Sequence, residues 1–311
     1  MRFSTLLAVV ALACTSVHGA ALTKVSNYGG KATSKAQMWV YVPDNVKPNP
    51  SLVVAIHSCE SSAQKYFQND KIPWKKGSDG KGYVTIWPSA PQSCWDVSSK
   101  STLVRNGGGD SNAIANMIIY AMDKYKVNAT QVFVTGGSSG GRISFLLASD
   151  SGGVTDSAPA MMGNVMAAAY PDLMSAVSVY SGVAAGCYVG AGVAQWNNAC
   201  ANGQSTKTAQ AWGDIARAIY PGYNGTRPRM QIWHGSADGT IAPQNYQEEL
   251  KQWTNIFGVS MNATDSKDNT PEAKYKTSNY GPNVQGIYAT GVGHSCPSHL
   301  AESEAWFGLV K

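Results

Sequence analysis

The chain has 311 residues, of which 43% are hydrophobic, so it can form one large core or two modest domains. Its 24 Lys and Arg and 19 Asp and Glu give a formal net charge of +5, and charged residues are only 14% of the total. This composition argues against a disordered chain, and the singly scattered cations argue against a nucleic-acid-binding protein. Nine Trp and 15 Tyr among so few charges favour a secreted protein that meets a neutral, sugar-like surface.

The first 20 residues have the layout of a signal peptide. Arg2 supplies a positive charge, residues 6–14 are an apolar run, and small residues follow it, so we expect cleavage after Gly19 or Ala20. The run is too short to span a bilayer, which needs about 20 apolar residues, and no later segment reaches that length. We therefore expect a secreted, extracellular protein without a membrane span. Residues 21–311 should form a single domain, because no repeat or linker interrupts them.

Segments with the patterns of strands and helices alternate along the chain. Short apolar, β-branched or aromatic runs predict strands at Gln37–Val42, Leu52–Ile56, Tyr83–Trp87, Val132–Thr135, Ala176–Tyr180, Met230–His234 and Gly286–Ala289. Helical periodicity predicts helices at Asp110–Tyr125, Met161–Tyr170, Thr208–Ile219, Asn245–Phe257 and Ser298–Phe307. This alternation is typical of an α/β fold with a mainly parallel sheet and helices on both faces. Residues 262–283 are polar, and we expect a surface excursion there.

Secretion implies that cysteines form disulfides, and five cysteines remain after the signal peptide. Cys187 and Cys200 lie close together in a Gly-rich region, which favours a local bridge. Cys59 and Cys94 each follow a predicted strand, and neighbouring parallel strands could bring them together. We therefore expect these two disulfides, with Cys296 free. Three Asn-x-Thr sequons are candidate glycosylation sites: Asn128, Asn224 and Asn262.

The strongest chemical motif is Gly-Gly-Ser-Ser-Gly-Gly at residues 136–141, directly after the predicted strand Val132–Thr135. Gly-x-Ser-x-Gly after a strand is the signature of a nucleophile elbow, a sharp turn in which glycines avoid clashes with neighbouring backbone. Two registers fit, one with Ser138 and one with Ser139 as the nucleophile. In the first register, the backbone N–H of Ser139 would help to bind an oxyanion.

The partners of a serine nucleophile follow the elbow in the order of α/β-hydrolases, which is serine, acid and histidine. Asp238 and His294 each follow a predicted strand, at the strand ends where α/β sheets place their sites. His234, which ends the strand before Asp238, is expected to be only a packed neighbour. The loop after an earlier strand contains Ser58 and Cys59, where a second oxyanion donor usually arises. The sequence has no metal-ligand cluster and no phosphate loop, so we expect no metal and no cofactor.

With these residues the chain resembles the secreted fungal acetylxylan esterases of carbohydrate esterase family one, relatives of the feruloyl esterases and polyhydroxybutyrate depolymerases. The resemblance covers nearly the whole chain after the signal peptide. Besides the elbow, it rests on Val53–His57, Cys94–Ser99, Asn106–Ser111, Ala169–Leu173, Tyr180–Val183, Tyr220–Tyr223, Pro243–Tyr246, Gly291–His294 and Ala305–Gly308. Matched residue by residue, it implies an α/β-hydrolase fold with Ser138 as nucleophile, Asp238 as acid and His294 as base.

The resemblance also implies an enzyme that removes O-acetyl groups from acetylated xylan or xylo-oligosaccharides in plant cell-wall hemicellulose. We expect a monomer that binds neither nucleic acid nor membranes. Trp95 and Trp306 are candidates for an aromatic side chain that faces the sugar. Two alternatives remain: a feruloyl esterase with the same triad, and a catalytically disabled relative that only binds polysaccharide.

Two departures from the family pattern stand near the expected site. The family usually has a Gly shortly after the loop cysteine, where this chain has Glu60-Ser61-Ser62. Residues 141–159 also intervene before Ala160, whereas in the family the elbow continues directly into that residue. The 19 inserted residues equal 57 nucleotides, an in-frame length. Codons for a splice donor, a branch point and an acceptor are possible at Gly141-Arg142, Thr155-Asp156 and Pro159-Ala160.

The inserted segment is therefore predicted to be a translated intron. The alternative is a genuine insertion, in which residues 142–148 form the helix of the elbow and residues 149–159 loop out.

Overall fold

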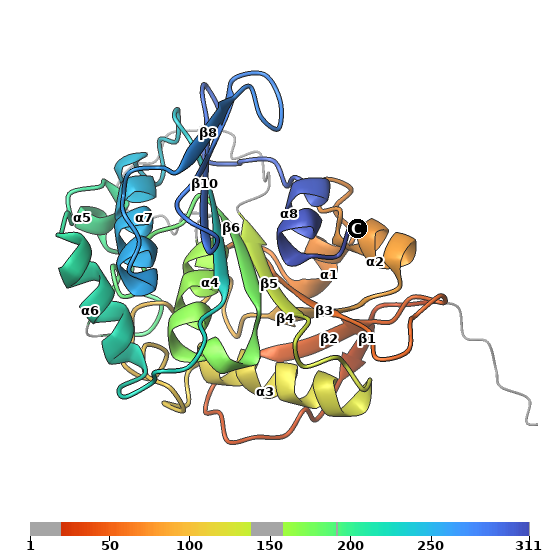
Figure 1. The fold of residues 1–311 in the computed structure, drawn as a ribbon. Coiled ribbons are helices and arrows are strands. Elements are labelled where there is room, and N and C mark those ends of the chain that lie inside the picture. The colour runs from red at the N-terminus through yellow and green to blue at the C-terminus, as the bar shows by residue number, and fades with distance from the viewer. Residues whose placement is uncertain (1–19, 138–157, 191, 311) are drawn as a thin grey trace, which may run out of the picture.

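The computed structural model describes residues 20–137, 158–190 and 192–310 of the chain. Their strands form one ten-stranded sheet in the order β1-β2-β4-β3-β5-β6-β7-β10-β9-β8 (Figure 1). The strands are β1 (Thr23–Val25), β2 (Gln37–Tyr41), β3 (Leu52–Ile56), β4 (Val84–Ser89), β5 (Val132–Gly137), β6 (Ala176–Tyr180), β7 (Arg229–Gly235), β8 (Asp265–Asp268), β9 (Tyr275–Asn279) and β10 (Val284–Ala289).

The middle of the sheet is parallel and its two margins are antiparallel. Strands β4, β3, β5, β6, β7 and β10 pair in parallel, one after the other. Strands β1 and β2 extend the sheet at one margin, and β9 and β8 extend it at the other, in antiparallel register. The carboxyl ends of the six central strands therefore meet at one edge of the sheet, where an α/β protein forms its site.

Helices cover both faces of the sheet (Figure 1). They are α1 (Ala63–Phe67), α2 (Trp74–Lys81), α3 (Asp110–Lys124), α4 (Ala158–Ala169), the 3₁₀ turn η1 (Pro171–Leu173), α5 (Asn198–Ala201), α6 (Ala209–Ile219), α7 (Gln244–Phe257) and α8 (Leu300–Phe307). On β3, Leu52, Val54 and Ile56 join the core under α3, α4, α6 and α7. Val53 and Ala55 point the other way, into the core under α1, α2 and α8. The expected α/β architecture is confirmed. In the described ranges, no helix is long and apolar enough to cross a membrane.

The polar region 262–283 differs from the expectation. Part of it forms β8 and β9, an antiparallel hairpin that extends the sheet beyond β10. Every residue of β8 is exposed, so its sequence carries no apolar alternation that could have signalled a strand. Backbone hydrogen bonds pair β8 with β9 and β9 with β10, and backbone pairing produces no pattern of residue types that a sequence could show. The strand β1 also escaped prediction, because it has only three residues and two of them are exposed.

Candidate active site

Two loops at the carboxyl edge of the sheet are held together at the ends of β7 and β10. Ser236 donates its backbone N–H to the carbonyl of Ala289 at 2.9 Å, and Ala237 donates to the carbonyl of Val292 at 2.9 Å. A Cβ atom on Gly235 would lie 2.2 Å from that Val292 oxygen, so only glycine permits this approach. The first loop carries Asp238 and the second carries His294, and their backbones fix how the two side chains meet.

Asp238 and His294 form a hydrogen-bonded pair. Nδ1 of His294 lies 2.8 Å from Oδ2 of Asp238. The other carboxylate oxygen accepts the backbone N–H groups of Thr240 at 2.9 Å and Ile241 at 2.8 Å. The Asp238 side chain is fully buried, whereas that of His294 is 10% exposed. This is the arrangement in which an acid orients an imidazole for proton transfer.

The electrostatics of Asp238 and His294 suit His294 to act as a general base. Burial by itself raises the pKa of Asp238, but hydrogen bonds from His234 and His294 outweigh burial and hold this pKa well below its usual range. The acid therefore stays ionised and fixes the hydrogen of His294 on Nδ1. Nε2 of His294 then carries a lone pair, and no described residue bonds to it. That nitrogen can accept a proton from a nucleophile.

The strand that should lead to the nucleophile is present as β5. Strand β5 ends at Gly137, the residue before Ser138, while Ser138 and Ser139 themselves lie outside the described residues. A Cβ on Gly137 would lie 2.9 Å from the side chain of Tyr180 on β6, so this strand end requires a small residue. Strand β5 is separated from β7 by β6 alone, and its carboxyl end lies at the same edge of the sheet as those of β7 and β10.

The loop with Ser58 and Cys59 follows β3, which pairs with β5. Both residues are buried, and no described residue accepts a hydrogen bond from either backbone N–H. The imidazole of His57 holds this loop through both of its nitrogens. Nε2 accepts the backbone N–H of Ala90 at 3.0 Å, and Nδ1 lies 2.7 Å from the carbonyl oxygen of Ser58. Burial lowers the pKa of His57 to about 4, although the bond to Ser58 opposes this, so the ring is neutral.

The structure contains both expected disulfides. Cys59 is bridged to Cys94 with a Cα–Cα distance of 4.3 Å, and Cys187 is bridged to Cys200 with a Cα–Cα distance of 5.8 Å. Cys296 is a free, buried thiol. The first bridge ties the loop after β3 to the segment after β4, and so anchors the candidate oxyanion loop.

The two tryptophans proposed to face the sugar lie in different places. Trp95 is 1% exposed, and its indole N–H donates to the carbonyl oxygen of His57 at 3.1 Å. It therefore supports the candidate oxyanion loop. Trp306 packs at the opposite end of β7, where the guanidinium of Arg229 lies 5.1 Å from its ring centroid. The burial of Trp95 therefore contradicts a sugar-facing role for it. Trp306 is half-buried, and a sugar-facing role for it stays a prediction.

The three sequon asparagines lie away from the catalytic pair. Asn224 and Asn262 are exposed. Asn128 is half-buried, and its Oδ1 accepts hydrogen bonds from the backbone and hydroxyl of Thr130. Glycosylation at these positions stays a prediction.

Two polar residues beneath the site were not given a role from the sequence. His234 is buried with its Nε2 3.4 Å from Oδ2 of Asp238, so it touches the same carboxylate as His294. Glu249 on α7 is buried as well. The sequence carried no signal for either, because β7 also holds Arg229 and Gln231 and the buried face of α7 holds several other polar side chains.

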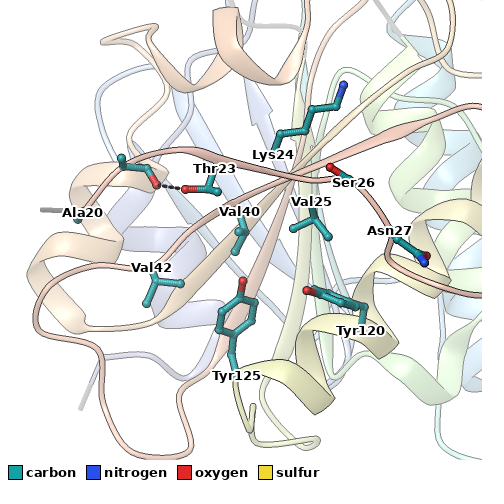
Figure 2. A pocket seen from close by; sticks show the side chains of 11 residues that line it. Ala20, Thr23, Lys24, Val25, Ser26, Asn27, Val40, Val42, Tyr120 and Tyr125 are labelled. Carbon is teal, nitrogen blue, oxygen red and sulfur yellow. Dashed lines mark hydrogen bonds between the residues drawn. The ribbon is translucent and has the colours of Figure 1, made fainter. Parts of the chain in front are cut away.

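A cavity in the described residues lies away from the Asp238–His294 pair. It has a volume of about 670 Å³ and lies between β1 and the end of α3 (Figure 2), where Tyr120 and Tyr125 face Val25 and Val40. It contains none of the candidate catalytic residues. Nor do the described ranges contain a group of His, Cys, Asp and Glu side chains that could hold a metal ion.

No family model matches the chain, but individual relatives do. It is 48% identical over 295 residues to a probable acetylxylan esterase A of Aspergillus clavatus, covering 93% of this chain and 89% of that protein. It is 47% identical over 298 residues to acetylxylan esterase A of Talaromyces purpureogenus, covering 94% and 72%. The solved acetyl xylan esterase from Aspergillus awamori matches with a TM-score of 0.85 at 43% identity, over 93% of this chain and 100% of that one. The resemblance seen in the sequence is confirmed, and the chain belongs to the acetylxylan esterases, carboxylic-ester hydrolases with the α/β-hydrolase fold.

Proposed function

We propose that this chain is a secreted serine esterase that removes O-acetyl groups from xylan and so aids the breakdown of hemicellulose. The observation that carries the proposal is the 2.8 Å bond between Asp238 and His294, on the loops that follow two adjacent parallel strands of a chain 48% identical to an acetylxylan esterase. Neither a feruloyl esterase nor a disabled polysaccharide-binding relative is favoured by the relatives.

The first half of the reaction forms an acyl-enzyme. Nε2 of His294 takes the hydroxyl proton of Ser138, whose oxygen attacks the acetyl carbonyl and forms a tetrahedral intermediate. Asp238 stabilises the imidazolium that results. The imidazolium then gives its proton to the sugar oxygen, and the deacetylated sugar leaves with the acetyl group bound to the serine.

The second half regenerates the enzyme. His294 takes a proton from water, the hydroxide attacks the acyl carbonyl, and acetate leaves as Ser138 recovers its proton. The oxyanion of both steps would be held by the backbone N–H of Ser139 and by an N–H from the loop with Ser58 and Cys59. Each such donor contributes about 3 kcal/mol. No cofactor is needed for either half.

The proposal is tested most simply with 4-nitrophenyl acetate. The purified chain should hydrolyse it, and a serine-directed inhibitor should abolish the activity. Polysaccharide binding without hydrolysis would identify the disabled relative instead. The feruloyl alternative is tested by comparing kcat/KM on acetylated and feruloylated xylan, which should favour the acetyl ester.

We also propose that residues 141–159 are a translated intron. In an elbow, a helix begins immediately after the serine and directs its first N–H groups at the oxyanion. Here α4, described from Ala158 onward, packs against both β5 and β6, and it contains Ala160, the residue that follows the elbow directly in the family. Joining Gly140 to Ala160 would restore that spacing. Sequencing the transcript tests this, because mature message that keeps these codons would contradict it.

We also propose that the protein is secreted after cleavage of its signal peptide. Two disulfides require an oxidising compartment. The N–H of Ala20 donates to the carboxylate of Asp44 at 3.0 Å, so cleavage after Gly19 would place a new ammonium group beside an acid. N-terminal sequencing of secreted protein should therefore begin at Ala20 or Ala21. We expect the mature protein to be a monomer of one domain.

A further inference from the structure

A row of stacked side chains lies at the amino edge of the sheet, opposite the edge that carries the catalytic pair. The guanidinium of Arg105 lies 4.3 Å from the ring centroid of Tyr220, and the rings of Tyr220 and Tyr223 stack with their centroids 4.9 Å apart. The guanidinium of Arg227 lies 5.3 Å from the ring centroid of Tyr223. These stacking and cation–π contacts restrain the segment before β7 and the side chain of Arg227.

Three arginines in this region differ in their partners. Arg105 forms a bidentate ion pair with Asp172, with N–O distances of 2.6 and 2.8 Å. Arg217 on α6 forms an ion pair with Asp214 at 3.1 Å. Arg227 has neither an acidic partner nor a hydrogen bond among the described residues, and its Nη1 atom is buried without a partner. Arg227 is therefore the one cation of the three whose charge is not compensated.

The surroundings of Arg227 make its charge unfavourable as long as no anion is bound. Burial lowers the pKa of Arg227, and the charge of Arg217 lowers it further, although Tyr223 opposes this change. A guanidinium nevertheless stays charged at any ordinary pH. Because the side chain is already held against Tyr223, it could bind an anion with little loss of conformational freedom.

Arg227 lines a cavity of about 410 Å³. The cavity lies between residues 223–227, the carboxyl ends of the adjacent helices α6 and α7 (Figure 1), and the turn before β10. Helix α6 contributes Arg217, α7 contributes Ile256 and Phe257, and the turn contributes Asn283. No Asp or Glu is among these lining residues, so the lining has an excess of positive charge. Small-molecule sites have volumes of about 300–1,000 Å³, so the cavity can hold a sugar ring.

The lining combines three kinds of group that suit an acidic sugar. A guanidinium such as that of Arg227 recognises a carboxylate through two parallel hydrogen bonds. Amides such as those of Asn224 and Asn283 can bond to hydroxyl groups, and Ile256 and Phe257 can contact the C–H face of a ring. An inorganic anion would use the guanidinium alone, so this set of residues fits an acidic sugar better.

We propose that this cavity binds a uronic acid unit of a plant cell-wall polysaccharide, with Arg227 holding its carboxylate. The seven residues of β7 separate Arg227 from the loop with Asp238, a distance of roughly 20 Å along the strand. The site therefore anchors the polymer and takes no part in the reaction. The inference goes beyond the proposed function, and its test does not depend on hydrolysis.

The test is binding to deacetylated xylan, which leaves no acetyl ester to hydrolyse. Xylan with glucuronic acid side groups is compared by titration calorimetry with the same xylan after reduction of its carboxyl groups to alcohols. The parent should bind the carboxylated form at least fivefold more tightly. Arg227→Gln should abolish this preference, and Arg227→Lys should keep part of it, because lysine retains the charge but not the bidentate geometry. Lys267→Gln, which removes a charge from the exposed strand β8, is the control and should keep the full preference.

Three results would overturn the proposal. The first is an equal preference for carboxylated xylan in the parent and in Arg227→Gln, with thermal unfolding showing that the variant is folded. The second is displacement of the polymer by sulfate as effectively as by free glucuronate, since the cavity would then be a general anion site. The third is a preference that appears only after enzymatic deglycosylation, because Asn224 lines the cavity and its own glycan would then be the occupant.

Failure of the esterase function would look different. A chain that prefers carboxylated xylan through Arg227 but releases no acetate would contradict the proposed function and leave the uronic acid site in place.

Discussion

The Nδ1 atom of His294 lies 2.8 Å from Oδ2 of Asp238, although 56 residues separate the two side chains in the chain. The pairing of β7 with β10 brings them together, because each residue sits on the loop that leaves one of these strands. The acid also accepts two backbone N–H groups of its own loop, so its orientation does not depend on the histidine. Catalysis should therefore be sensitive both to the carboxylate and to the packing of the two loops.

The first prediction concerns the carboxylate. Asp238→Asn removes the charge that stabilises an imidazolium at His294 and lets the ring adopt the wrong tautomer, so kcat should fall about 10⁴-fold. Rates on 4-nitrophenyl acetate measure this. Asp172→Asn, which breaks the surface pair with Arg105, is the control and should leave kcat within a factor of two. A loss of less than tenfold at Asp238 would remove it from the triad.

The second prediction concerns the contact between the loops. Gly235→Ala places a Cβ 2.2 Å from the carbonyl oxygen of Val292, so the two loops must separate. We expect a lower Tm and at least a tenfold loss of kcat, because small displacements of catalytic groups are costly. Gly239→Ala is a control in the same loop, since a Cβ there meets nothing within 4 Å. Equal activity in the two variants would show that the loop contact does not position the pair.

The third prediction is a dependence of stability on pH. The pKa of Glu249 is raised by burial to about 7 from an ordinary value of 4.5. The folded protein thus keeps this proton where the unfolded chain loses it, and the associated stability is present below pH 4.5 and lost as pH rises to 7. The loss amounts to about 3 kcal/mol. Glu249→Gln has no such loss, so its Tm relative to the parent should rise between pH 4.5 and 7.

Denaturation curves at pH 4.5, 6 and 8 test this expectation. A constant difference in Tm between the parent and Glu249→Gln across the three values would mean that Glu249 does not titrate in this range.

The fourth prediction concerns residues 141–159. Their deletion joins Gly140 to Ala160, the third residue of α4, so the helix follows the elbow almost directly. We expect the shortened chain to fold, to show a Tm no lower than that of the full chain, and to have at least tenfold higher kcat/KM on acetate esters. A shortened chain that is unfolded, or less active than the full chain, would favour a genuine insertion.

The sequence was most informative where burial and chemistry leave a local pattern. Leu52–Ile56 is apolar throughout because it is buried on both faces, and β3 has the predicted bounds. The cysteines that follow the ends of β3 and β4 are bridged because those strands pair. Asp238 and His294 could be found because the order of acid and histidine after the elbow follows from the fold.

The sequence was least informative where a role depends on contacts between distant segments. Trp95 was a candidate for contact with the sugar, yet it is buried and donates its indole N–H to the carbonyl oxygen of His57. His234 lies near the end of a buried strand, so the sequence indicated ordinary packing and not a contact with Asp238. Glu249 faces the core from a helix whose partner strand cannot be identified by periodicity. In each case three-dimensional packing decides the role, and residue type does not reveal it.

The central claim is that Ser138 attacks acetyl esters of xylan with His294 as its base. The most direct test is the rate of acetate release from acetylated xylan by the chain without residues 141–159, measured for the parent, Ser138→Ala and Ser139→Ala. The parent should release acetate, Ser138→Ala should be slower by several orders of magnitude, and Ser139→Ala should lose far less, because it keeps its backbone N–H. Undiminished release by Ser138→Ala, or equal losses in both variants, would contradict the account.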